Sequence, residues 1–124
     1  MKSRVIVSAV IEKEDLLLFW KKLTNVWPYP NTWHLIGGGL NEWEPITEWI
    51  AREILEEAGI QVEILEPISF DEDFEPNKYG EMTHYIFLVF RAKYIWWEVT
   101  AGDDIRKLEW ISRERLSEIE LNKP

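Results

Sequence analysis

Cysteine is absent from this chain of 124 residues. A chain without cysteine can form neither a disulfide framework nor a thiolate metal site. Long hydrophobic runs are also missing, since no stretch approaches the roughly 18 uninterrupted apolar residues of a membrane-spanning helix. Residues 1–13 lack the layout of a signal peptide. We therefore expect a cytoplasmic protein that has no membrane partner.

Positive charge is scarce, with 14 lysine and arginine residues against 23 acidic residues and a formal net charge of −9. Binding to nucleic acids and to anionic lipid depends largely on neutralisation of phosphate by basic side chains. The charge therefore argues against a nucleic-acid partner. A small polyanionic substrate can still bind if divalent cations reverse the local field, so any activity on phosphates requires a metal.

The remaining composition is that of an ordinary globular protein, because 46% of the residues are hydrophobic and 30% are charged. The length allows one compact domain over residues 1–124. Eight tryptophans are present, and most of them should be buried. Trp96 and Trp97 are adjacent in the sequence, and because successive residues of a strand face opposite ways, their side chains cannot both enter one core. We place one of them at a subunit contact and expect a homodimer.

Patterns of hydrophobic and turn-forming residues predict strands at 4–12, 15–22, 33–36, 61–71, 83–94 and 107–111. A helix should begin at Pro45 and end at Ala58, because Pro45 suits a first turn and Gly59 is a stop signal. Its apolar face, with Ile46, Trp49, Ile50 and Ile54, should pack on a core. A second helix is expected at 113–121, and polar loops at 23–31 and 73–80. The segment 83–94 is apolar on both faces, as in a sheet that is covered on both sides. We thus predict an α/β fold with a mixed sheet between helices.

The motif that carries chemistry spans residues 38–60, GGLNEWEPITEWIAREILEEAGI. Gly38 is followed after five residues by Glu44, and after seven more by Arg52-Glu53-Ile54-x-Glu56-Glu57-x-Gly59-Ile60. A chance match at these positions is on the order of 10⁻⁹ per starting point. The spacing resembles the defining box of the Nudix hydrolase family. The lead-in WHLIGGG and the later segment DDIRKLEWISRERL extend this resemblance over most of the chain.

Glu53, Glu56 and Glu57 stand at i, i+3 and i+4 of the expected helix, so their carboxylates share one patch. These carboxylates repel one another, and they lie in the last turns of a helix, where the dipole favours cations. A solvated acidic face is the ordinary interpretation of such a run. The surrounding glycines, Glu44 and Arg52 favour a site for a hard divalent cation instead, and Mg²⁺ prefers oxygen ligands.

The resemblance implies a Nudix α/β/α fold and hydrolysis of a phosphoanhydride bond in a nucleoside diphosphate derivative with Mg²⁺, for which Mn²⁺ can substitute. It assigns Glu56 and Glu57 as metal ligands and Glu53 as ligand or general base. Gly37 and Gly38, where the backbone is free to take unusual dihedrals, let a backbone carbonyl reach the metal. Arg52 can bind a carboxylate through two parallel bonds, and Glu53 or Glu44 is its natural recipient.

Two more positions come from the same resemblance. Asp104 precedes the last strand, where the family often has another acidic residue for metal or water, although a polar turn explains it equally well. Trp43 stands where the box commonly has glycine, and Ile36 where the lead-in commonly has proline. Trp43 could narrow the phosphate site or stack on a base.

Substrate choice lies outside the box. Trp27 and Tyr29 in the first loop and Tyr79 in the second could stack on a base, and Lys21 could meet phosphates, although each is more often structural. His34 and His84 fit packing roles. We expect a (deoxy)nucleoside triphosphate, cleaved to the monophosphate and pyrophosphate. The alternatives are a nucleotide-sugar or dinucleotide such as ADP-ribose, or a nucleotide-binding regulatory module without catalysis.

Overall fold

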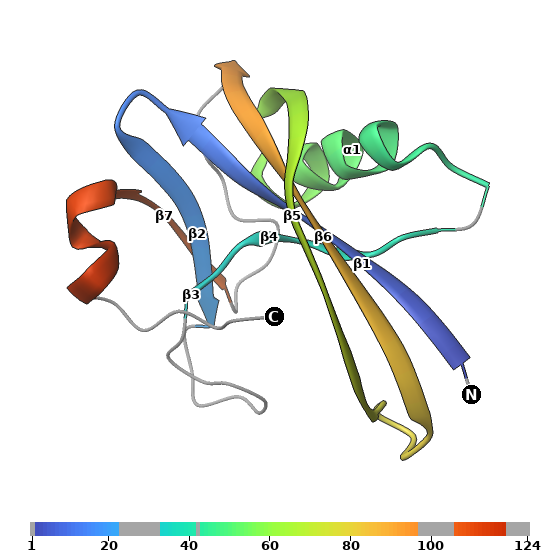
Figure 1. The fold of residues 1–124 in the computed structure, drawn as a ribbon. Helices are drawn as coiled ribbons and strands as arrows, with labels where there is room; N and C mark the ends of the chain where they lie inside the picture. Colours follow the sequence, from blue (N-terminus) through green and yellow to red (C-terminus); the bar gives the residue numbers. More distant parts are fainter. Residues whose placement is uncertain (1, 23–32, 42, 97–105, 119–124) are drawn as a thin grey trace.

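The computed structural model describes residues 2–22, 33–41, 43–96 and 106–118 (Figure 1). Strands make up most of this part of the chain, together with one α-helix and one 3-10 helix. No helix within the described ranges is long and apolar enough to cross a membrane. The elements follow the order β1 (Lys2–Lys13), β2 (Leu16–Lys22), β3 (Trp33–His34), β4 (Ile36–Gly39), α1 (Ile46–Ala58), β5 (Gln61–Pro76), β6 (Met82–Trp96), β7 (Arg106–Ser112) and η1 (Arg113–Glu118).

Strand β1 is the centre of the mixed sheet, whose order is β3-β2-β1-β6-β5. It pairs in parallel with β6 from Lys2 opposite Thr83 to Glu12 opposite Lys93. On its other edge, β1 pairs antiparallel with β4 and, near its end, with β2. Figure 1 shows β1 between β6 and β4. The glycine strand β4 is therefore held in place by β1.

Helix α1 forms as the sequence predicts. Pro45 precedes its first residue, and Gly59 ends it with a left-handed backbone, at φ 73°, where the Gly59 N–H donates to the Leu55 carbonyl at 2.9 Å. Its buried residues are Trp49, Ile50, Ile54 and Ala58. They pack against Val7, Ala9 and Ile11 of β1 in the main core. This packing fixes the helix against one face of the sheet.

Alternate residues of the central strands face opposite sides of the sheet. Phe90 and Ala92 of β6 join the core beneath α1. Phe87 and Val89 point to the other side, where they line a cavity. The expectation of helices on both faces is thus only partly confirmed. The chain forms the 3-10 helix η1 at 113–118, and residues 119–121 lie outside the described ranges.

The hairpin of β5 and β6 is longer than predicted. Residues 73–76 belong to β5 rather than to a loop, with Asp73 opposite Tyr85 and Glu75 opposite Thr83. The acidic, proline-containing sequence indicated a loop. However, these side chains are exposed, so their polarity costs nothing in a strand, and pairing with β6 satisfies the backbone.

Candidate active site

Arg52 of α1 binds carboxylates from two segments. Its Nη1 lies 3.0 Å from Oε2 of Glu44, in the segment before the helix. Its Nη2 and Nε lie 3.6 Å from Oε1 of Glu53 and of Glu56, respectively. The prediction that Arg52 binds Glu53 or Glu44 is confirmed for both, with the shorter distance to Glu44. Arg52 therefore ties the entry of the helix to its acidic face.

The acidic cluster is defined here as Glu44, Glu53, Glu56 and Glu57. The single guanidinium of Arg52 faces three of these carboxylates, those of Glu44, Glu53 and Glu56. Glu56 is exposed and the other three are half-buried, with Oε2 of Glu57 fully covered. In the described ranges, no three acidic or histidine side chains are gathered as a metal-ligand group, and Glu53 and Glu56 both lie at ion-pair distance from Arg52. The excess negative charge and the all-oxygen donors still fit a hard divalent cation.

The glycines of β4 do not adopt the unusual dihedrals that the sequence led us to expect. Positive φ values occur at Gly59 and Gly80 among the described glycines, so Gly37, Gly38 and Gly39 are not in the left-handed region. A Cβ on Gly37 would collide with the Val7 carbonyl oxygen and the Ser8 backbone, whereas a Cβ on Gly38 would meet the Trp49 ring at 3.6 Å. Gly37 is thus needed for close approach of β4 to β1, not for unusual dihedrals.

A cavity of about 200 Å³ lies on the sheet face away from α1. Its walls come from five elements: β1, β2, β3, β4 and β6. Trp20 and His34 stack in its lining with ring centroids 4.4 Å apart, and Trp20 Nε1 donates to the Leu35 carbonyl at 3.1 Å. The lining consists of Ile6, Ser8, Trp20, His34, Leu35, Gly37, Gly38, Phe87 and Val89. We refer to this space as the aromatic cavity.

The sequence did not point to Trp20 or His34 as cavity residues. Their pairing across β2 and β3 brings them together, and a strand of only two residues gives no sequence signal for such pairing. His34 was expected to be a packing residue, and it does stack on Trp20. His84, on the other face, stacks on Phe74 at 4.3 Å and contacts the Glu72 carboxylate at 2.7 Å.

The structure does not place several of the predicted site residues at the acidic cluster or in the aromatic cavity. Trp27, Tyr29 and Asp104 lie outside the described residues. Lys21 lies with its Nζ 5.1 Å from the ring centroid of Trp33, away from the aromatic cavity. Trp96 is 56% exposed on β6, and its neighbour Trp97 lies outside the described ranges, so the homodimer stays a prediction.

Trp43, in the segment before α1, has a backbone conformation that is unusual for an L-residue. Its side chain is 98% exposed and its φ is +71°, a left-handed conformation that glycine adopts without strain.

We expect Trp43→Gly to raise the free energy of unfolding by ~0.5–1 kcal/mol. The left-handed region costs an L-residue about 1–2 kcal/mol, and the larger backbone entropy of glycine in the unfolded chain cancels part of the strain that is relieved. Urea denaturation measures this. Trp43→Ala is the control, since alanine keeps the strain. A destabilised Trp43→Gly protein would show that the exposed ring contributes contacts.

The sequence and fold of this chain are similar to those of known proteins of one family. A family model described as a NUDIX domain matches residues 2–124. The chain is 30% identical to a nucleoside triphosphatase NudI of Enterobacter sp. (strain 638), over 98% of this chain and 91% of that protein. A MutT NUDIX hydrolase from Burkholderia pseudomallei is 25% identical, with a TM-score of 0.75 over 100% of this chain and 90% of that one. A MutT protein from Bacillus halodurans, 23% identical, has a TM-score of 0.77 over 95% and 74% of the two chains.

The chain belongs to the Nudix family. It is a Nudix hydrolase, an enzyme that acts on phosphoanhydride bonds of nucleotides.

Proposed function

We propose that this enzyme hydrolyses a (deoxy)nucleoside triphosphate to the monophosphate and pyrophosphate in an Mg²⁺-dependent reaction. The observation that supports this proposal is the position of the aromatic cavity. Its lining includes Gly37 and Gly38, at the start of the Nudix box. Its volume of about 200 Å³ is below the ~300–1,000 Å³ of pockets that enclose drug-sized ligands. It suits one base better than two linked nucleoside or sugar groups. The name of the NudI relative supports the same choice.

The acidic cluster would hold the cation. We assign Glu56 and Glu57 as ligands, with the Gly37 carbonyl, and Glu53 as a ligand or the general base. When bound, Mg²⁺ supplies positive charge opposite phosphate oxygens and makes a coordinated water more acidic. Asp104 is a further candidate for binding the metal or the attacking water.

The protein side chains contribute positioning. Arg52 holds Glu44 at 3.0 Å and Glu53 at 3.6 Å, so the Glu53 carboxylate is oriented before substrate arrives. From that position, Glu53 can accept a proton from the attacking water. The stacked rings of Trp20 and His34 offer an aromatic wall for the base, since stacking on an aromatic ring stabilises a bound base by ~1–3 kcal/mol. Gly38, Trp27, Tyr29, Lys21 and Trp43 stay predicted substrate contacts.

A nucleotide panel tests this proposal. We expect at least one of the eight common ribo- and deoxyribonucleoside triphosphates to give a monophosphate and pyrophosphate with Mg²⁺, resolved by ion-exchange chromatography. Colorimetric phosphate should appear only after a pyrophosphatase is added. Glu57→Gln protein, purified in parallel, controls for contaminating hydrolases.

Two outcomes would contradict the proposal. Direct release of phosphate with a diphosphate product would mean that a different bond is cleaved. A tenfold or greater preference in kcat/KM for ADP-ribose over every triphosphate would place the enzyme among nucleotide-sugar hydrolases. Nucleotide binding without turnover would favour a regulatory module, against which the complete box argues.

A further inference from the structure

A second pocket, of about 440 Å³, adjoins the end of the glycine strand. It lies between the start of β1, the residues that follow β4 and the tip of the β5–β6 hairpin. Residues that line it include Lys2, Arg4, Gly39, Asn41, Tyr79 and Tyr85. Polar groups dominate this lining, in contrast to the aromatic cavity. We refer to it as the polar pocket.

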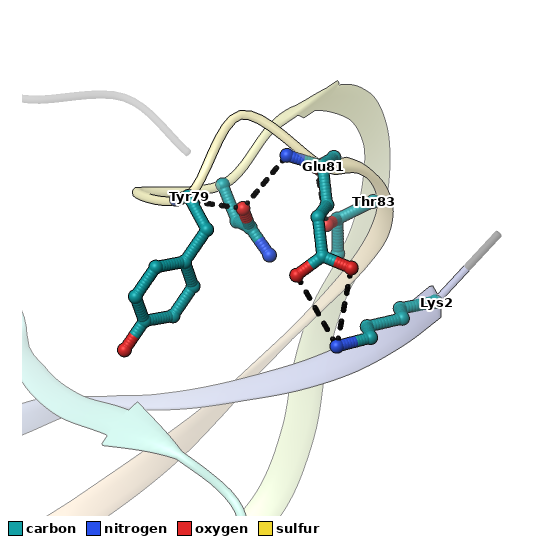
Figure 2. Close-up of polar contacts among 5 residues, drawn as sticks. Lys2, Tyr79, Glu81 and Thr83 are labelled. Atoms are coloured by element: carbon teal, nitrogen blue, oxygen red, sulfur yellow. Dashed lines mark hydrogen bonds and ion pairs between the residues drawn. The ribbon is translucent and has the colours of Figure 1, made fainter.

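The hairpin side of the polar pocket is held by hydrogen bonds (Figure 2). Oδ1 of Asn77 accepts from the backbone N–H groups of Tyr79 and Glu81, at 2.9 and 3.0 Å. Lys2 Nζ lies 3.2 Å from both carboxylate oxygens of Glu81. The turn that carries Tyr79 is therefore fixed, and the charge of Lys2 is already compensated.

Arg4 differs from Lys2 because its charge is not compensated. No carboxylate among the described residues pairs with its guanidinium. The other arginine side chains that the structure describes all have acidic partners, namely Arg52, Arg91, Arg113 and Arg115. In a chain of net charge −9, an arginine without an acidic partner is a strong candidate for binding an anion.

The position of Arg4 depends on Gly39. A Cβ at Gly39 would collide with the Arg4 guanidinium, with Nε at 2.7 Å and Cζ at 2.8 Å. The guanidinium therefore occupies the space that a side chain at residue 39 would fill. Gly39 follows directly on Gly37 and Gly38 of the aromatic cavity. A positive charge is thus placed at the end of the strand where the box begins.

The two pockets lie one after the other on the same sheet face. Ser8 and Ile6 of β1 line the aromatic cavity, and Arg4 lines the polar pocket. On β6, Phe87 and Tyr85 follow in the same order. Ser8 and Arg4 are separated by about 13 Å at ~3.3 Å per strand residue. A nucleoside in the first pocket can direct its phosphate chain past Gly38 toward the second.

We propose that Arg4 binds the outer phosphate groups of the substrate and thereby selects polyphosphorylated nucleotides over monophosphates. This inference rests on the proposed function and adds a specificity-determining residue to it. A guanidinium suits the task because it binds phosphate oxygens through two parallel hydrogen bonds. The fold supplies the space for it by having glycine at residue 39.

Binding of inorganic tripolyphosphate tests Arg4 without requiring turnover or a known base. Isothermal titration calorimetry in Mg²⁺ buffer would compare wild type with Arg4→Ala, Gly39→Ala and the control Lys93→Ala, which removes an exposed cation elsewhere on β6. We expect Arg4→Ala to raise Kd by ~10–100-fold, as for loss of hydrogen bonds to a charged group. Lys93→Ala should change Kd less than twofold.

Gly39→Ala provides a second test that leaves every charge in place. Its backbone φ permits alanine, and the added methyl displaces the flexible end of Arg4. Kd for tripolyphosphate should therefore rise severalfold while the melting temperature stays near that of wild type. An Arg4→Ala protein that binds tripolyphosphate within twofold of wild type would overturn the inference, as would a wild type that does not bind it.

Kinetics with the best triphosphate of the panel separate the inference from the proposed function. Arg4→Ala should raise KM for that triphosphate by ~10–100-fold, with Ki for the corresponding monophosphate unchanged. If both constants rise equally, Arg4 contacts the nucleoside and the inference fails while the activity stands. If no triphosphate is hydrolysed, the proposed function fails, and the calorimetry still decides whether Arg4 binds phosphate groups.

Discussion

Glu57→Gln should lower kcat by at least ~10³, because loss of a metal ligand removes several kcal/mol of charge stabilisation in the transition state. The same loss is expected for Glu56→Gln. Steady-state kinetics over a range of Mg²⁺ concentrations measure the effect, and wild type should be inactive in EDTA. Turnover at the normal rate in EDTA would rule out the metal site.

Glu48→Gln is the matched control for these variants. Glu48 lies in the first turn of the same helix, exposed and outside the fixed positions of the box. Glu48→Gln removes the same charge as Glu56→Gln or Glu57→Gln, and its kcat should stay within twofold of wild type.

The free energy of unfolding distinguishes a metal ligand from a structural residue. The contact of Glu56 with Arg52 is an exposed ion pair, so Glu56→Gln should change the free energy of unfolding by less than ~1 kcal/mol. A large loss would make Glu56 a structural residue.

Gly37→Ala should destabilise the protein by at least ~2 kcal/mol, since the added methyl meets backbone atoms of β1 that cannot move aside cheaply. Opening of the β1–β4 pairing would also shift the Gly37 carbonyl and reduce activity. Equilibrium urea unfolding gives the stability, and circular dichroism verifies that the variant folds.

Gly38→Ala is the neighbouring comparison. Its methyl would meet the Trp49 ring at 3.6 Å, an ordinary van der Waals distance, so the free energy of unfolding should change by less than ~1 kcal/mol. Equal stability losses at the two positions would show that glycine is needed there for backbone freedom rather than for close approach.

The sequence predicted those structural features that depend on residues close to one another in the chain. Pro45, Gly59 and the apolar spacing between them gave the helix, because capping and amphipathic periodicity act within a few turns. We predicted Glu53 or Glu44 as the partner of Arg52 and did not predict Glu56, although its i,i+4 spacing from Arg52 brings the two side chains together on the helix. Glu44 was named from the family resemblance as a possible partner of Arg52, and the two side chains do form an ion pair.

Features that depend on pairing across the sheet were not predictable in this way. Residues 73–76 read as a loop, but their partners on β6 make them a strand. Trp20 and His34 meet because β2 pairs with β3. The role of Gly37 depends on how closely β1 approaches. The space above Gly39 is filled by Arg4, which lies 35 positions earlier in the chain.

The parallel pairing of β1 with β6 has a consequence for the order of folding. Lys2 lies opposite Thr83, so the centre of the sheet joins residues from distant parts of the chain. Closing such a long loop costs entropy before any contact compensates for it, and non-local pairing slows folding. Residues of β1, β4 and β6 line both pockets. During synthesis the helix with its glutamates can form early, whereas the substrate pockets assemble only after β6 has been made and has docked beside β1.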